Sequence, residues 1–285
     1  MEKTTQNSYH THISSKHNAL ELKLDEVWRY RDLILLFTKR NFVVRYKQTI
    51  LGPAWILLNP LFSSIIYAIV FGGIAKIGTE GIPTILFYLC SNAIWLFFAT
   101  CVTTNARTFT ENANVFGKVY FPRLTMPISN MLSAGIHFCV QMLMVLGFLG
   151  FYLVQGAVHP NWAAWLLIPV VLLHLGMLGL GCGIIVSSLT TKYRDLAILV
   201  DFAMQLWMYA TPVVYPLSTL EPGWIRTILL INPVTAPVEF FRYAILGQGS
   251  ILPGVLALSW AITIGVMLIG IVIFNKVERT FMDTV

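Results

Sequence analysis

Three sets of polar side chains recur at helical spacing inside otherwise apolar stretches of the sequence. Ionised and amide side chains are costly inside an apolar helix, so they usually face a bundle interior or a hydrated path. We expect the first and the third set to line such a path, and we favour hydrogen bonding between helices for the second. In order, the sets are Asn59, Ser63 and Tyr67; Asn130, Ser133, His137 and Gln141; and Asp201, Gln205 and Tyr209.

Aromatic rings accompany the first and the third set. They are Trp55, Phe62, Tyr67 and Phe71, and Phe202, Trp207, Tyr209 and Tyr215. Rings with a polar edge pack on the C–H faces of sugars without fixing their register, so Tyr67, Trp207 and Tyr209 are predicted to border a path for a glycan. Aromatic residues also anchor helices at membrane interfaces, and this alternative stays open for Trp55 and Tyr215.

No spacing in the sequence indicates catalytic chemistry. His137 and His174 have no acid or nucleophile close by in the sequence, and no Gly-rich phosphate loop ends in Gly-Lys-Ser/Thr. The cysteines show no metal-ligand spacing and are interpreted as apolar packing residues; they are Cys90, Cys101, Cys139 and Cys182. We expect a chain that is not an enzyme and that itself binds no cofactor or metal.

The elements that position these residues are long apolar runs. Of the 285 residues, 56% are hydrophobic and only 11% are charged, whereas soluble domains carry about 25% charged residues. A spanning helix takes roughly 20 apolar residues. The sequence therefore predicts an all-α integral membrane protein with six transmembrane helices per subunit and no removable signal peptide. The six runs cover residues 53–75, 83–106, 128–155, 162–189, 196–215 and 251–274.

The basic residues determine the predicted orientation. With both termini in the cytoplasm, sixteen of the nineteen Lys and Arg residues lie on the inner side, and only Lys76, Arg226 and Arg242 lie outside. Cytoplasmic enrichment of Lys and Arg sets membrane topology. The formal charge of +6 is thus explained by topology, so we expect membrane lipid and no nucleic acid as a partner.

The chain divides into three predicted regions. Residues 1–20 have little to bury and are expected to form a disordered cytoplasmic tail. Residues 21–50 are predicted to form an amphipathic interface helix, with Val27, Ile34 and Phe37 on a face that sinks into the acyl boundary. Residues 51–285 form the transmembrane domain.

Two features of the later spans predict close packing. Residues 216–250 are apolar but broken by prolines, which favours two short re-entrant helices between spans five and six. Within them Glu239 and Arg242 are three residues apart and are expected to pair. Gly179 and Gly183 form a small-xxx-small pair in span four, which allows close approach of another helix.

Seven short segments together carry a family resemblance. They are LDEVWRYRDLI at 24–34, RYKQTILGPAW at 45–55, GKVYFPRLTMP at 117–127, KYRDL at 192–196, TPVVYP at 211–216, INP at 231–233 and KVERTFMD at 276–283. In these segments the chain resembles the ABC-2 type polysaccharide permeases that export O-antigen and related glycans. The resemblance covers residues 22–285.

The resemblance implies a bacterial inner-membrane permease subunit that moves lipid-linked, O-antigen-like polysaccharide out of the cytoplasm. It implies a homodimer with a channel between the subunits, and two copies of a separate cytoplasmic ATPase that bind ATP and Mg. It further implies that the N-terminal helix and the 107–127 loop contact the ATPase. The residues assigned to this coupling are Trp28, Arg29, Arg31, Glu111, Lys118 and Arg123.

Asp201 departs from the smooth, uncharged path that the resemblance implies, and we expect it to approach Lys192 or Arg194 at the inner interface. Three alternatives stay open. Two are ABC-2 permeases, for teichoic-acid-type polymers or for a hydrophobic small molecule. The third, from a different class, is a multi-span acyl or glycosyl transferase built on Asp195, Asp201 or Glu239 with Arg242.

Overall fold

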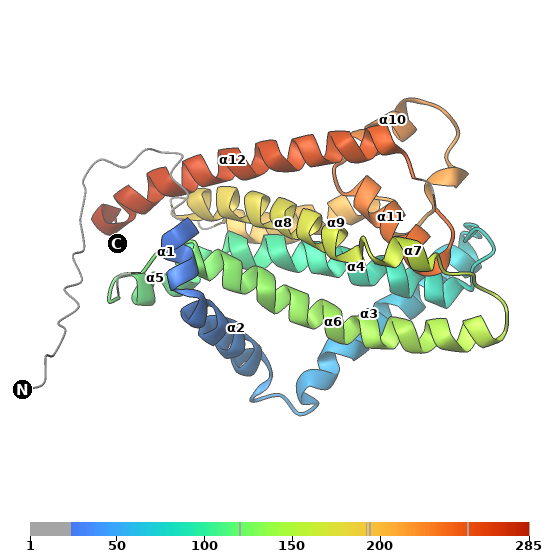
Figure 1. The fold of residues 1–285 in the computed structure, drawn as a ribbon, viewed down its shortest axis with the longest axis horizontal. Coiled ribbons are helices and arrows are strands. Elements are labelled where there is room, and N and C mark those ends of the chain that lie inside the picture. The colour runs from blue at the N-terminus through green and yellow to red at the C-terminus, as the bar shows by residue number, and fades with distance from the viewer. Residues whose placement is uncertain (1–23, 120, 192, 194, 250, 285) are drawn as a thin grey trace, which may run out of the picture.

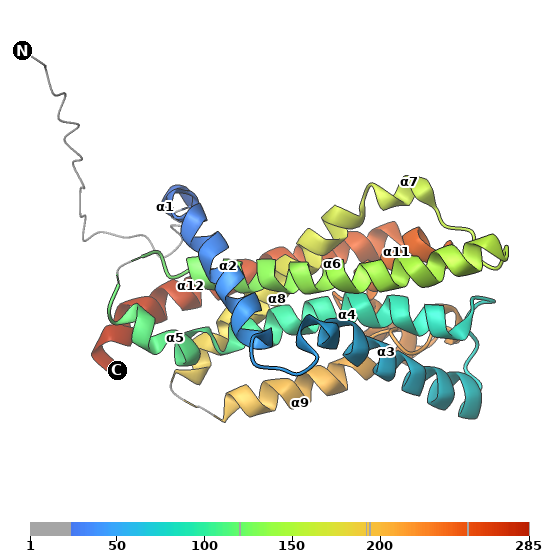
Figure 2. The same ribbon diagram turned by 90° about the horizontal axis from the view of Figure 1, so that it is seen from below.

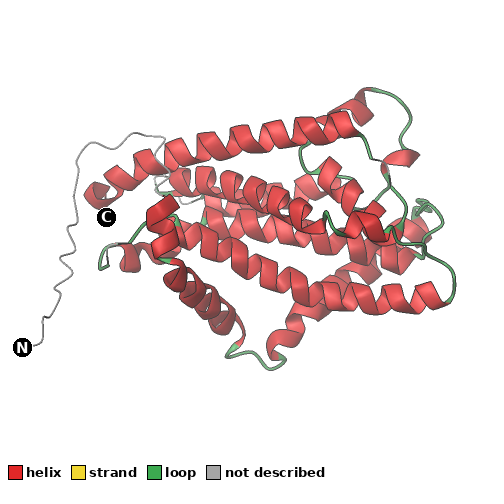
Figure 3. Cartoon of the chain, in the orientation of Figure 1, coloured by secondary structure: helices red, strands yellow, loops and turns green. Residues whose placement is uncertain are grey.

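The computed structural model describes residues 24–284 except 120, 192, 194 and 250, so the predicted tail at 1–20 lies outside the described residues. The helices of the described residues, shown in Figure 1, are α1 (Leu24–Arg29), α2 (Arg31–Tyr46), α3 (Trp55–Tyr67), α4 (Thr84–Ala106), α5 (Thr108–Phe116), α6 (Thr125–Val154), α7 (Trp162–Trp165), α8 (Ile168–Thr190), α9 (Leu196–Tyr209), α10 (Trp224–Ile231), α11 (Thr235–Leu246) and α12 (Pro253–Thr284). Short 3₁₀ turns cover Gly52–Ala54 and Leu217–Thr219, and a π-helical stretch, Ala68–Ile74, extends α3. The prediction of an all-α protein is confirmed for the described residues (Figure 3).

The long helices lie side by side as an elongated bundle (Figures 1 and 2). Within the part of the chain that the structure describes, five helical segments are long and apolar enough to cross a membrane: Gly52–Ile74, Thr84–Ala106, Thr125–Val154, Ile168–Thr190 and Pro253–Val277. In the most apolar part of α4, 78% of the residues are buried, against 17% for Gly52–Ile74. The helix α4 is therefore the centre of the bundle, and α3 lies at its edge.

Glycines let α8 approach α4. A Cβ added to Gly179 would lie 2.6 Å from the Cβ of Cys101, and one added to Gly183 would collide with Asn105. Close backbone approach is what small residues provide between membrane helices. The predicted small-xxx-small contact is confirmed, and α4 is the helix that it meets.

The fifth predicted span differs from the prediction. The helix α9 ends at Tyr209 instead of residue 215 and has 14 residues, a length of about 21 Å against a hydrocarbon core of about 30 Å. The chain that follows α9 is held by Asn232. The Nδ2 of Asn232 donates to the carbonyl oxygen of Ala210 at 2.7 Å and to the Thr211 hydroxyl at 2.9 Å. Pro212 and Pro216 have no N–H for a helical ladder, so the chain turns here.

Two short helices occupy the 216–250 segment, as predicted. The axes of α10 and α11 meet at 85° across a short break. The side chains of α11 are mostly buried, including Val238 and Phe241. This helix is therefore part of the protein core, packed against α4 and α8.

The N-terminal helices pack against protein, which corrects one expectation. Val27, Ile34 and Phe37 are buried, with Phe37 5.6 Å from Phe121 between ring centroids. The face predicted to sink into the acyl boundary is therefore covered by α6 and the loop before it. A different set of apolar side chains is exposed on α2: Leu35, Leu36, Val43 and Val44.

The two ends of the bundle have different elements. The helices α1 and α5 and the C-terminal part of α12 gather at one end, which we call the α5 end (Figures 1 and 2). The helices α7, α10 and α11 lie toward the other end, which we call the α11 end (Figure 1). The described segments nearest the two termini thus share one end.

Candidate functional site

The predicted polar set of the first span is partly used for packing. The Ser63 hydroxyl donates to the carbonyl oxygen of Asn59 at 2.7 Å and accepts from Nδ2 of Asn92 on α4 at 3.0 Å. The hydroxyl of Tyr67 lies 3.4 Å from the sulfur of Met208 on α9. Asn59 is exposed. Ser63 and Tyr67 therefore join α3 to its neighbours, and Asn59 presents its amide to the outside.

The predicted residues of the fifth span lie on two different sides of α9. Gln205 and Tyr209 are exposed, and the Tyr209 ring lies 6.4 Å from that of Phe71. Trp207 points into the bundle, where its Nε1 donates to Asn232 Oδ1 at 3.1 Å and its ring lies edge-on to Phe98. The structure thus separates Trp207 from the exposed side of α9.

Asp201 has a partner that the sequence did not indicate. Its carboxylate forms an ion pair with Arg107, the residue between α4 and α5, and both side chains are partly exposed. Lys192 and Arg194, its expected partners, lie outside the described residues. Arg107 directly follows the apolar run of the second span. Its position at the end of a span is the sequence feature that could have identified it as a partner for Asp201 at the membrane interface.

Of the polar set of the third span, Asn130 and Ser133 form the predicted hydrogen bonds between helices, whereas His137 bonds to the carbonyl oxygen of Ser133 on its own helix. Asn130 is the centre of this network. Its Nδ2 donates to Asn105 Oδ1 at 3.2 Å, and its Oδ1 accepts from Nδ2 of Asn41 at 2.9 Å. Asn41 lies on α2, so the network ties the N-terminal helix to α4 and α6.

The 107–127 segment is anchored to the bundle by aromatic rings and presents charges outward. Phe109 stacks on Phe274 of α12 with ring centroids 4.8 Å apart. Glu111 and Lys118 are exposed. Arg123 is only 8% exposed, and its guanidinium lies 5.7 Å from the ring centroid of Phe116. Glu111 and Lys118 are accessible to a second protein, whereas Arg123 packs inside the corner between α5 and α6.

The helix α1 adds a second exposed surface at the same end. Trp28, Arg29 and Arg31 are all exposed, and the Arg31 guanidinium lies 5.7 Å from the Trp28 ring centroid. Figures 1 and 2 place α1 and α5 at the same end of the bundle. The structure therefore brings the predicted coupling residues of both segments to the α5 end.

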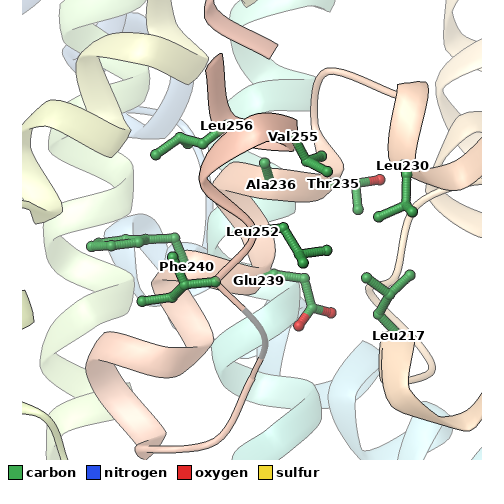
Figure 4. Close-up of a pocket in the computed structure, with 10 residues that line it drawn as sticks. Leu217, Leu230, Thr235, Ala236, Glu239, Phe240, Leu252, Val255 and Leu256 are labelled. Atoms are coloured by element: carbon green, nitrogen blue, oxygen red, sulfur yellow. The ribbon is translucent and has the colours of Figure 1, made fainter. Parts of the chain in front are cut away.

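The predicted Glu239–Arg242 ion pair is confirmed and is buried in protein. Arg242 donates from Nη2 to Glu239, and neither side chain is more than 3% exposed. The guanidinium also lies 4.7 Å from the ring centroid of Phe87. Figure 4 shows Glu239 beside a small, mainly apolar cavity of about 10 Å³, room for about one water molecule.

The candidate groups for a transferase do not converge. Asp201 pairs with Arg107, and Glu239 pairs with Arg242. Within the described part of the chain, no group of three His, Cys, Asp or Glu side chains is arranged to hold a metal ion.

Comparison with known proteins agrees with this architecture. The family described as ABC-2 type transporter matches residues 32–246. An O-antigen export system permease protein RfbA of Klebsiella pneumoniae is 28% identical over 257 residues, covering 88% of this chain and 94% of the relative. The protein of the same name from Myxococcus xanthus is 28% identical over 221 residues, covering 76% of this chain and 81% of the relative. Because the family match covers about three quarters of the 285 residues, the chain belongs to the ABC-2 type transporter family.

Proposed function

We propose that this chain is the permease subunit of an ABC exporter that moves lipid-linked, O-antigen-like polysaccharide from the cytoplasm across the inner membrane. The observation that carries the proposal is the joint display of α1 and α5 at one end of a bundle of long apolar helices. The names of the relatives supply the cargo class. Energy comes from ATP hydrolysis, with Mg, in a separate ATPase subunit.

The α5 end is the proposed ATPase-facing surface. Trp28 and Arg29 on α1, Arg31 at the start of α2, Glu111 on α5 and Lys118 just after α5 present exposed charge and one exposed ring. Exposed charges of both signs give a docking surface specificity. Arg123 supports the same loop from inside. One ATPase copy per subunit would dock here. The excess of basic residues in these segments supports a cytoplasmic location for this end and for both termini.

The translocation path is proposed to run along the side of the bundle formed by α3 and α9. This side has large exposed apolar residues on both helices: Phe62, Ile65, Ile66 and Ile69, and Ile198, Phe202 and Leu206. A second copy of the chain facing this side would form a homodimer with Asn59, Gln205 and Tyr209 next to the seam. Ser63, Tyr67 and Trp207 hold α3 and α9 in position behind it.

The test is complementation. A strain that lacks the genes for this chain and for its ATPase partner is supplied with this chain alone, with this chain and the ATPase, or with this chain and an ATPase inactivated at its own phosphate loop. We expect surface polysaccharide only when the chain and the active ATPase are both present. Surface polysaccharide made without the ATPase, or a strain that exports normally without the chain, would contradict the proposal.

A further inference from the structure

A polar cavity of about 400 Å³ lies among α2, α4, α5 and α6. This volume falls in the range of roughly 300–1,000 Å³ typical of small-molecule sites. The cavity is lined by Arg40, Asn41, Val44, Arg45, Thr100, Thr104, Glu111, Asn112, Val115, Asn130, Ser133, Ala134 and His137. Ten of these thirteen side chains are polar.

Arg40 is held in the wall of the cavity by amide side chains, and within the described part of the chain it has no carboxylate partner. Its Nη2 donates to Asn41 Oδ1 at 3.1 Å and to Asn112 Oδ1 at 3.2 Å. Its guanidinium lies 4.8 Å from the Phe37 ring centroid. Among the described residues its hydrogen-bond acceptors are neutral amides, and burial lowers the pKa of the Arg40 guanidinium. An anionic ligand would offset this cost of desolvation.

The charges that face the cavity favour an anion. Arg40 and Arg45 contribute two positive charges, and Glu111 on α5 contributes one negative charge at the same cavity. Arginine is the side chain best suited to bind phosphate, because its planar guanidinium donates two parallel hydrogen bonds. The net charge of the lining is therefore positive, with the carboxylate of Glu111 limiting how much negative charge it accepts.

His137 lines the cavity from α6 and offers a hydrogen-bond acceptor for a hydroxyl group of a ligand. Its Nδ1 lies 2.6 Å from the carbonyl oxygen of Ser133, which can only accept, so Nδ1 is the protonated nitrogen. The side chain is 9% exposed, and Nε2 is buried without a partner among the described residues. A neutral Nε2 accepts a hydrogen bond, and a sugar hydroxyl is the complementary donor.

We infer that this cavity binds a sugar phosphate, with the phosphate between Arg40 and Arg45 and the sugar hydroxyls near Asn130 and His137. The inference rests on the proposed function, for which it places the headgroup of the lipid-linked glycan. Thr100, which lines the cavity, precedes the end of α4 by six residues, or about 9 Å. This depth suits a headgroup that enters from the inner leaflet. Arg40 also contacts Asn112 on α5, so the bound group would touch the segment assigned to the ATPase.

The test is a binding assay on the purified complex of the chain with its ATPase, held in phosphatidylcholine nanodiscs. The probe is a radiolabelled hexadecyl phosphate ester of glucose. Three competitors test which part of the probe is recognised. Hexadecyl glucoside has no phosphate, glucose 1-phosphate has no lipid chain, and phosphatidylglycerol has a lipid phosphate without a sugar. We expect the probe to bind, glucose 1-phosphate to compete weakly, and the other two to compete least.

The variants locate the site. Arg40→Gln should weaken binding about tenfold or more, the range expected when a hydrogen bond to a charged group is lost. Arg40→Lys should recover part of this loss, and His137→Ala should weaken binding of the probe. The matched control is Lys39→Gln, which removes the same charge from the adjacent exposed position of α2 and should change affinity less than twofold. Size-exclusion profiles and thermal midpoints without probe identify variants that fail to fold.

Any of three results would overturn the inference. The first is an equal loss of probe affinity in Arg40→Gln and Lys39→Gln. The second is an affinity for hexadecyl glucoside equal to that for the probe, and the third is displacement of the labelled probe by phosphatidylglycerol as effectively as by unlabelled probe. The last result would make the cavity a site for membrane lipid. Absence of binding together with normal export in Arg40→Gln cells would refute this inference and leave the proposed function standing. Failure of the unsubstituted chain to restore export would instead refute the proposed function.

Discussion

Arg107, between α4 and α5, forms an ion pair with Asp201 of α9. It thereby links the segment assigned to ATPase coupling with the helix assigned to the translocation path. The pair is partly exposed, with side-chain exposures of 39% and 45%, and such pairs contribute roughly 0–1 kcal/mol to stability. Because the Arg107–Asp201 pair joins the start of α5 to α9, it can transmit a movement of α5 to α9. This role fits the pair better than a role in stabilising the fold.

Neutralising either member of this pair should reduce export while leaving the complex assembled. We expect Arg107→Gln and Asp201→Asn each to lower the export rate several-fold and to leave the thermal midpoint within the small range that exposed pairs produce. The double charge swap, Arg107→Asp with Asp201→Arg, should export better than either charge-reversed single variant. The measurement is a pulse-chase of surface polysaccharide, and a swap no better than the singles would show that the two residues act separately.

Charge reversal in the 107–127 segment should have different effects at exposed and buried positions. Glu111→Lys and Lys118→Glu change exposed side chains, so expression should be normal and association with the ATPase should fall. Arg123→Glu places a carboxylate at a residue that is 8% exposed and whose native guanidinium packs against the ring of Phe116. This change should lower stability as well, because an unpaired buried charge is costly.

Co-purification of the ATPase and the thermal midpoint of the chain measure these two effects. The neutral variants Glu111→Gln and Lys118→Gln serve as controls and should retain more ATPase than the reversals. Full ATPase association in both exposed reversals would remove α5 from the docking surface. A stable Arg123→Glu protein would contradict its assignment as a support of the loop.

Gly247→Ala should unfold the α11 end. Gly247 follows α11 at φ 76°, in the left-handed region that favours glycine. A Cβ at this position would collide with the backbone carbonyl of His159. The backbone conformation and the clash together should cost about 3 kcal/mol or more. Fluorescence-detected size exclusion on heating measures the loss.

Gly135→Ala is the matched control for this substitution. Gly135 lies inside α6, and an added Cβ there meets nothing within 4 Å outside its own helix. Alanine at that position should be neutral or slightly stabilising. Equal thermal midpoints for the two variants would mean that the turn after α11 relaxes without loss of structure.

The sequence was most informative where a single helix determines its own boundaries. The second span was predicted at 83–106 and is observed as Thr84–Ala106, because its apolar run is continuous and is preceded by Pro83. The Glu239–Arg242 pair was also predictable, since three residues of spacing on one helix bring the two side chains together. Local pattern alone is sufficient in both cases.

The sequence was less informative where two helices must be rotated against each other. The 14-residue length of α9 depends on Asn232, which satisfies the backbone of the turn after it. The orientation of Trp207 depends on Phe98 and the same Asn232. The acyl-facing side of α2 was assigned to the wrong side chains, because periodicity identifies an apolar face but does not show whether lipid or protein covers it.

The measurement that tests the path along α3 and α9 most directly is cysteine accessibility during active export. Single cysteines at Asn59, Gln205 and Tyr209 are compared with cysteines at the buried positions Met204 and Ser64, in a chain whose exposed Cys139 is replaced by alanine. Tyr67→Cys and Trp207→Cys report on the half-buried rings behind the path.

Membrane-impermeant thiol reagents are applied with ATP and glycan, and again with the ATPase inactivated. We expect the cysteines at 59, 205 and 209 to react faster during active export and to be protected when a stalled glycan occupies the path. The cysteines at 204 and 64 should stay unreactive in both states. Unreactive cysteines at all three exposed positions during active export, together with normal export by Tyr209→Ala, would contradict a glycan path along α3 and α9.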